Sequence, residues 1–181
     1  INQINQAFVN TVRASGGNNA ERYLMVPGYD ASADGALNSG FVLPTDTVED
    51  KLIVSIHAYT PYNFALQADG ESGSISAFDS DTARFTADID SFMDRLYKKF
   101  IANGIPVVIG EFGSRDKGQN TQSRVDHATY YIAAARARGM SCFWWDNNAF
   151  TGKGENFGLY YRRGGYFIYP EIVTGLMKYA D

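Results

Sequence analysis

The chain has 181 residues, 45% of them hydrophobic and 14% aromatic, which is enough for a sizeable core in a single domain covering residues 1–181. Its formal net charge of −4 and the lack of any block of lysine and arginine argue against nucleic acid as a partner. No apolar run approaches the roughly 20 residues of a membrane span, so a membrane partner is not expected either.

Predicted helices and strands alternate along the chain. In order, the hydrophobic patterns predict a helix at 1–15, strands at 22–26 and 52–58, a helix at 81–102, a strand at 106–111, a helix at 122–138, a strand at 140–145 and a helix at 169–179. Loops rich in Gly, Asn, Asp and Ser are predicted between them, at 30–50, 60–80, 114–121 and 146–165. Each of these loops follows a strand.

This alternation is typical of parallel strands joined by right-handed crossovers. Four strands are too few for a closed eight-stranded barrel, which takes about 250 residues. Two α/β architectures therefore remain, an open doubly wound sheet and the second half of a (β/α)8 barrel. The long loops after the strands favour the half barrel, because barrels build their sites from such loops.

One carboxylate stands at the end of a buried strand. Glu111 follows the apolar run Val107-Val108-Ile109 and precedes Phe112-Gly113. A charge in such a place is costly unless it is paired or has a chemical role. In a barrel this strand end is where catalytic side chains lie. The alternative is a structural carboxylate held in a salt bridge.

Two other strand ends carry side chains suited to a sugar site. Strand alternation sends His57 and Tyr59 to the same face, where the Tyr hydroxyl can hold a carboxylate and the His can bind a substrate hydroxyl. Trp144 or Trp145 at the next strand end offers a flat apolar platform. Each residue alone could equally serve the core, but three strand ends of this kind together favour a site.

The remaining reactive residues predict no second site. His127 follows Asp126 on a predicted helix and is expected at the surface or in packing. Cys142 lies in an apolar run and is expected to be buried and inert. Two separate histidines and one cysteine do not form a metal-binding pattern, so no metal site is predicted.

Several motifs together resemble glycoside hydrolase family 5, the large retaining cellulase family. The segment from Val108 to Gly113 resembles the strand that carries the family's nucleophile, His57-Ala58-Tyr59 its sixth barrel strand, and Trp144 to Asn147 its eighth. Residues 11–26 resemble the fourth helix and fifth strand. The resemblance covers the whole chain in order. It is closest to the subfamily of endo-β-1,4-glucanases that includes xyloglucanases and mixed-linkage glucanases.

The resemblance implies the C-terminal half of a TIM (β/α)8 barrel, from helix four through strands five to eight with their helices. It makes Glu111 the nucleophile, Tyr59 its hydrogen-bond donor and His57 a contact of the sugar. A tryptophan would be the platform under that sugar, with Trp145 preferred and Trp144 as the alternative. Weaker candidates for substrate contact are Asn147, Tyr29 and Tyr62. The implied activity is retaining hydrolysis of internal β-1,4-glucosidic bonds in a secreted enzyme, without metal or organic cofactor.

Three features of the family have no counterpart in the sequence: its acid/base motif, an arginine on an early strand and a histidine on the third strand. The family's acid/base glutamate lies in Asn-Glu-Pro, which does not occur here. Retaining hydrolysis needs two carboxyl groups about 5–5.5 Å apart. We therefore expect this chain to be inactive alone and to need the N-terminal half of the barrel, as a separate chain or a missing segment. The alternatives are a non-catalytic carbohydrate-binding fragment and a xyloglucan- or mannan-specific member of the family.

Overall fold

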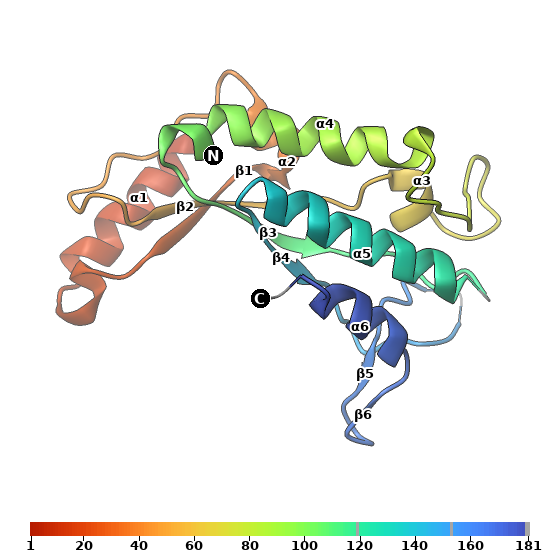
Figure 1. Ribbon diagram of the computed structural model, residues 1–181. Helices are drawn as coiled ribbons and strands as arrows, with labels where there is room; N and C mark the ends of the chain where they lie inside the picture. Colours follow the sequence, from red (N-terminus) through yellow and green to blue (C-terminus); the bar gives the residue numbers. More distant parts are fainter. Residues whose placement is uncertain (119, 153, 180–181) are drawn as a thin grey trace.

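A four-stranded parallel sheet forms the centre of the computed structural model, which describes residues 1–118, 120–152 and 154–179 (Figure 1). The strands are β1 (Leu24–Ser32), β2 (Leu52–His57), β3 (Val107–Phe112) and β4 (Ser141–Trp144), and they lie in the order β1-β2-β3-β4. Doubly wound sheets reverse their strand order at a switch point. This sheet has no reversal, so the doubly wound alternative is wrong.

The predicted helices are present with their ends shifted by a few residues. They are α1 (Asn2–Ala14), α4 (Ala83–Lys99), α5 (Thr121–Ala137) and α6 (Pro170–Met177). Helices α4, α5 and α6 lie side by side along one face of the sheet (Figure 1). Within the described ranges, no helix has the length and apolar character needed to cross a bilayer.

The sequence patterns missed several further short elements, most of them inside the predicted loops. These are α2 (Ala33–Leu37), α3 (Tyr62–Ala65), the 3-10 turns Gly17–Ala20 and Ile101–Asn103, and the projecting hairpin of β5 (Tyr160–Tyr161) and β6 (Tyr166–Phe167) (Figure 1). Strand β1 also runs to Ser32, beyond its predicted end at 26. Each missed element is too short for a hydrophobic period to form. Helix α2 instead depends on a local cap, since Ser32 Oγ accepts a hydrogen bond from Gly35 N–H.

The core lies between one face of the sheet and the helices. On this face the strand residues Val54, Ile56 and Ile109 are fully buried against α4 and α5, together with Met93 and Tyr131. Their neighbours in each strand point the other way. The opposite face carries Met25, Ser55, His57, Val108 and Phe143, and we call it the open face. Among the described residues, no helix covers it, and Met25 and Phe143 are 55% and 58% exposed.

Candidate active site

A β-bulge in β3 turns Glu111 toward the open face. Ile56 pairs with Ile109 and His57 pairs with Glu111, so β3 uses one residue more than β2 between these two pairs. The pairing of β3 with β4 is irregular over the same stretch. An extra residue re-aims the side chains that follow it. Phe112 is therefore buried against the helices, whereas Glu111 lies beside His57 on the open face.

The two glycines around Glu111 leave room for neighbouring side chains. A Cβ atom on Gly110 would lie 3.1 Å from Ser55 Oγ and 3.5 Å from the His57 ring. A Cβ atom on Gly113 would lie 3.2 Å from the Phe157 ring. Since few real Cβ contacts are that short, glycine at both positions allows the close approach of strands and loop at this strand end.

Tyr59 and His57 both contact the same oxygen of Glu111. Tyr59 Oη donates a 2.9 Å hydrogen bond to Oε2, and His57 Nδ1 lies 3.4 Å from that oxygen. Burial, aided by the Glu111 hydrogen bond, raises the pKa of Tyr59, which keeps the phenol protonated as a donor. No hydrogen bond within the described part of the chain reaches Oε1 of Glu111. One carboxylate oxygen is thus held, and the other is available to a ligand.

The two tryptophans at the end of β4 differ in their surroundings. Trp144 turns toward the helices, where its Nε1 donates to Phe157 O (3.0 Å) and its ring packs edge-on against Phe112 at 5.5 Å. Trp145 is 39% exposed, and its backbone N–H donates to Phe112 O. Neighbouring side chains of an extended segment point to opposite faces, so Trp145 is expected to point to the open face. Of the two predicted platforms, Trp145 is therefore the better candidate.

Asn147, a weaker candidate for substrate contact, has its amide engaged inside the loop after β4. Its Nδ2 donates to Glu155 O, and its Oδ1 accepts from the N–H groups of Ala149 and Phe157. These bonds define the path of the loop beside Trp145. Asn147 therefore shapes this side of the site through the loop backbone.

Of the two weaker tyrosine candidates, the structure groups only Tyr62 with the site. Tyr62 lines a hollow of about 520 Å³ together with His57 and Tyr59. Tyr29 is 68% exposed and borders a different hollow, next to Ile1. The weak prediction of substrate contact by Tyr29 thus has no support from its position.

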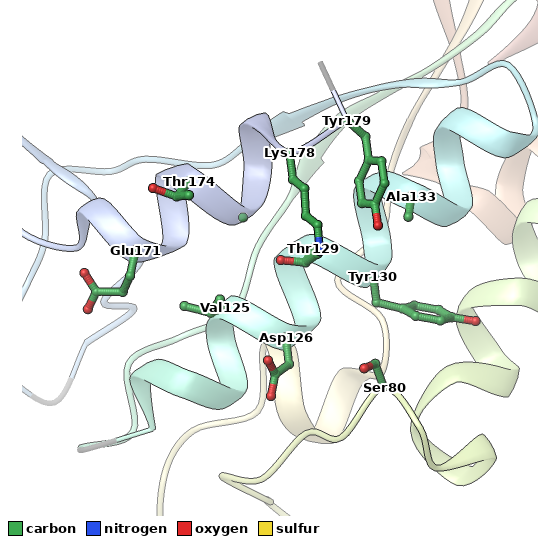
Figure 2. Close-up of a pocket in the computed structure, with 11 residues that line it drawn as sticks. Ser80, Val125, Asp126, Thr129, Tyr130, Ala133, Glu171, Thr174, Lys178 and Tyr179 are labelled. Carbon is green, nitrogen blue, oxygen red and sulfur yellow. The ribbon is translucent and has the colours of Figure 1, made fainter. Parts of the chain in front are cut away.

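A larger hollow lies away from these residues. It has a volume of about 610 Å³ and is lined mainly by residues of α5 and α6, among them Asp126 and Tyr130, and by Lys178 just after α6 (Figure 2). None of the candidate site residues lines it. Because α5 and α6 cover the face of the sheet opposite the open face, this hollow and Glu111 lie on opposite sides of the sheet.

Some residues around the site carry no recognisable sequence signal. The Phe157 ring packs 5.4 Å from the Tyr59 ring, and the charge of Glu155 contributes to raising the pKa of Tyr59. Both come from a loop without periodicity, so only the folded loop reveals them. His127, expected at the surface or in packing, proves fully buried, with its Nε2 2.9 Å from Thr60 O.

The described residues include neither a reactive thiol nor a cluster of metal-binding side chains. Cys142 is partly buried, and burial raises the pKa of its thiol to about 12, so the thiol stays protonated. Across residues 1–118, 120–152 and 154–179, no group of three or more His, Cys, Asp and Glu residues is placed to hold a metal ion.

The chain is similar to known cellulases both in its family match and in its relatives. The sequence model of the cellulase family (glycosyl hydrolase family 5) matches residues 1–151. Endoglucanase B of Neocallimastix patriciarum is 46% identical over 179 residues, which are 98% of this chain and 36% of that protein.

Solved structures agree with this match. A mutant family 5 lichenase from Caldicellulosiruptor sp. F32 in complex with cellotetraose is 58% identical with a TM-score of 0.98, covering 99% of this chain and 48% of that one. A broad-specificity endoglucanase from Ruminococcus champanellensis with bound cellotriose is 47% identical with a TM-score of 0.87, covering 97% and 49%. The chain spans about half the length of these structures. The sequential parallel sheet and this half-length match confirm the predicted half of a (β/α)8 barrel.

Proposed function

The chain belongs to glycosyl hydrolase family 5, and from this premise we propose that it is half of the barrel of a retaining endo-β-1,4-glucanase, with Glu111 as the nucleophile. The observation that carries the proposal is the geometry of that carboxylate. Its Oε2 accepts the Tyr59 hydrogen bond and lies near His57, while Oε1 has no hydrogen-bond partner among the residues that the structure describes. A nucleophile needs this combination of a fixed and an available oxygen.

The chemistry follows from two carboxyl groups acting in turn. Oε1 of Glu111 attacks the anomeric carbon, the glycosidic C–O bond breaks, and the leaving oxygen takes a proton from a second carboxylic acid. A covalent glycosyl–Glu111 ester results. The second group, now a carboxylate, removes a proton from water, which attacks the same carbon and releases Glu111. Two inversions at one carbon give net retention.

We assign the second carboxyl group to the other half of the barrel. Asn-Glu-Pro is absent from the 181 residues, and no acid of the chain has a matching motif. The other half would cover the open face and pair with the edges of β1 and β4. Support comes from the solved relatives, of which this chain covers 48% and 49%.

A chain of β-1,4-linked glucose units is the proposed substrate. The Caldicellulosiruptor lichenase is in complex with cellotetraose and the Ruminococcus champanellensis endoglucanase has bound cellotriose. In this chain Trp145 directly follows β4, its N–H donates to Phe112 O, and its exposed ring is a surface on which such a sugar can stack. Tyr62 and His57 extend the polar wall along the adjoining hollow.

The test assays carboxymethylcellulose and an aryl cellobioside with the chain alone and with the complete barrel, in which the other half is supplied. We expect no turnover by the chain alone, turnover by the complete barrel, and its loss in Glu111→Gln. The matched control is Glu49→Gln, which changes an exposed loop acid. Azide should restore glycosyl transfer to Glu111→Ala by occupying the vacated space.

Two outcomes would contradict the proposal. Turnover by the chain alone that disappears in Glu111→Gln would mean that the acid/base lies within the 181 residues. Binding of cello-oligosaccharides without hydrolysis by the complete barrel would indicate a non-catalytic carbohydrate-binding protein.

A further inference from the structure

Helix α5 supplies two buried hydrogen bonds to the backbone on either side of Tyr59. Tyr131 Oη donates to Ala58 O at 2.8 Å, and His127 Nε2 lies 2.9 Å from Thr60 O. Ala58 and Thr60 are the two residues that flank Tyr59. Both helix side chains are fully buried, with exposed fractions of 0%.

The two donors have the spacing needed to act together. Residues 127 and 131 are four apart on α5, so they lie on the same face of the helix, and their rings are 5.5 Å apart. Strand β2 ends at His57, so these two carbonyls lie beyond it. A carbonyl buried without a donor is costly, so the helix side chains fix the path of the backbone there.

Both side chains are neutral donors at ordinary pH. Burial lowers the pKa of His127 to about 4 and raises the pKa of Tyr131 well above its usual range. A carbonyl oxygen only accepts, so the His127 proton must be on Nε2. The two donors therefore stay in place across the pH range in which a glycosidase works.

The same helix also contacts the nucleophile strand. The Tyr131 ring stacks on Phe112 at 4.3 Å with an angle of 10° between the planes, and Phe112 directly follows Glu111. Between the two strands, Ala58 N–H donates to Glu111 O at 3.0 Å. Tyr131 thus touches the residue before Tyr59 and the residue after Glu111.

We propose that His127 and Tyr131 are positioning residues of the hydrolytic site, which hold the Tyr59 backbone so that its hydroxyl reaches Oε2 of Glu111. The inference rests on the proposed function but concerns residues that touch neither substrate nor carboxylate. It predicts that their effect on the reaction passes through Tyr59.

A double-mutant cycle in the complete barrel tests this directly. Tyr131→Phe removes one hydroxyl and keeps the ring on Phe112. We expect kcat to fall about fivefold to tenfold, the worth of one hydrogen bond, with KM unchanged. In the Tyr59→Phe background the same substitution should change kcat less than twofold. An equal loss in both backgrounds would mean a merely structural role and overturn the proposal.

The neighbouring tyrosine on α5 gives a matched control. Tyr130 Oη donates to Asp90 Oδ2 at 2.6 Å, and Tyr130 lines the outer hollow in Figure 2. Tyr130→Phe removes an equivalent hydroxyl from the same helix, and we expect kcat to stay within twofold. At the second position, His127→Gln keeps an N–H donor where Nε2 lies and should retain more activity than His127→Leu.

Crystal structures of these variants give a readout that needs no turnover. In Tyr131→Phe and His127→Leu the Tyr59 Oη–Glu111 Oε2 distance should lengthen beyond about 3.5 Å, the limit of a hydrogen bond. An unchanged 2.9 Å contact in both variants would overturn the inference. If the wild-type complete barrel has no glucanase activity but the distance lengthens in these variants, the proposed function fails and the positioning role stands.

Discussion

Tyr59, two residues beyond the end of β2, donates a 2.9 Å hydrogen bond to the Oε2 atom of Glu111 on β3. The contact depends on two local features. Alternation that continues from β2 past its last residue, His57, sends His57 and Tyr59 to the open face, and the bulge in β3 sends Glu111 to the same side. The Tyr59–Glu111 hydrogen bond therefore forms only when both strand ends have their native backbone conformation.

Tyr59→Phe should lower the kcat of the complete barrel roughly ten- to a hundredfold, with little change in KM. A hydrogen bond to a charged group contributes about 1.5–3 kcal/mol, and the free Glu111 carboxylate would lose its fixed orientation. Steady-state kinetics on an aryl cellobioside gives both constants. Tyr97→Phe, which alters an exposed tyrosine on α4, is the control. A kcat within twofold of the wild type would contradict a role for this bond.

The two tryptophans of β4 should separate binding from stability. Trp145→Ala removes the exposed ring, and the affinity of the complete barrel for cellotetraose should fall roughly fivefold to tenfold, as expected for one lost aromatic contact. Trp144→Phe breaks the bond from Nε1 to Phe157 O and should cost about 1 kcal/mol of stability. Titration calorimetry and thermal melting measure the two effects. The reverse pattern would make Trp144 the platform.

The sequence predicts the main elements well because their signals are local. Apolar periodicity marks α1 and α4, and the run before Glu111 marks a strand buried in the sheet. The strand-end argument also places His57, Tyr59 and Glu111 together, since parallel strands end at one edge of a sheet. Four predicted strands alone do not distinguish half of a barrel from an open sheet. The resemblance to glycoside hydrolase family 5 favours the half barrel.

The rest depends on contacts between distant segments. No local pattern marks the bulge that turns Glu111, because it is defined only by the pairing of β3 with its neighbours. The choice between Trp144 and Trp145 likewise follows from which face of β4 meets the helices. His127 lies 67 positions from its partner Thr60, so its buried role is visible only in the folded chain.

Burial of His127 should make stability depend on pH in a defined window. Its pKa is lowered to about 4 by burial and by the nearby Arg124 charge, whereas an unfolded His titrates near 6.5. Between these values the unfolded state binds more protons, so stability rises with pH there and falls as the pH drops from 6.5 toward 4. The gap between the two pKa values corresponds to about 3 kcal/mol at most.

The measurement compares urea unfolding of the wild-type and His127→Gln complete barrels at pH 7.5, 6 and 5. Carboxylates contribute to the pH dependence of both proteins and cancel in the difference. We expect the stability difference between wild type and variant to shrink as the pH falls, since only the wild type loses the contribution of a neutral His127. A difference independent of pH over this range would contradict the lowered pKa.

The open face should govern how the chain behaves without the other half of the barrel. On the open face, Met25 of β1 and Phe143 of β4 are 55% and 58% exposed, and exposed apolar faces promote association. The edges of β1 and β4 add unpaired backbone groups. In sedimentation velocity the chain alone should therefore run as a mixture of associated species, and in calorimetry it should melt without a sharp cooperative transition.

Phe143→Asp tests whether that face is what the other half covers. It should make the chain alone more soluble and lower its capacity to form the active barrel at least tenfold, since a charge would be buried in the assembled interior. Tyr97→Asp, which removes a 42% exposed ring from α4, should leave assembly unchanged. Assembly is followed by the recovery of glucanase activity on titrating one half with the other. Equal recovery for both variants would mean that the open face stays exposed in the complete protein, and the half-barrel assembly would have to be abandoned.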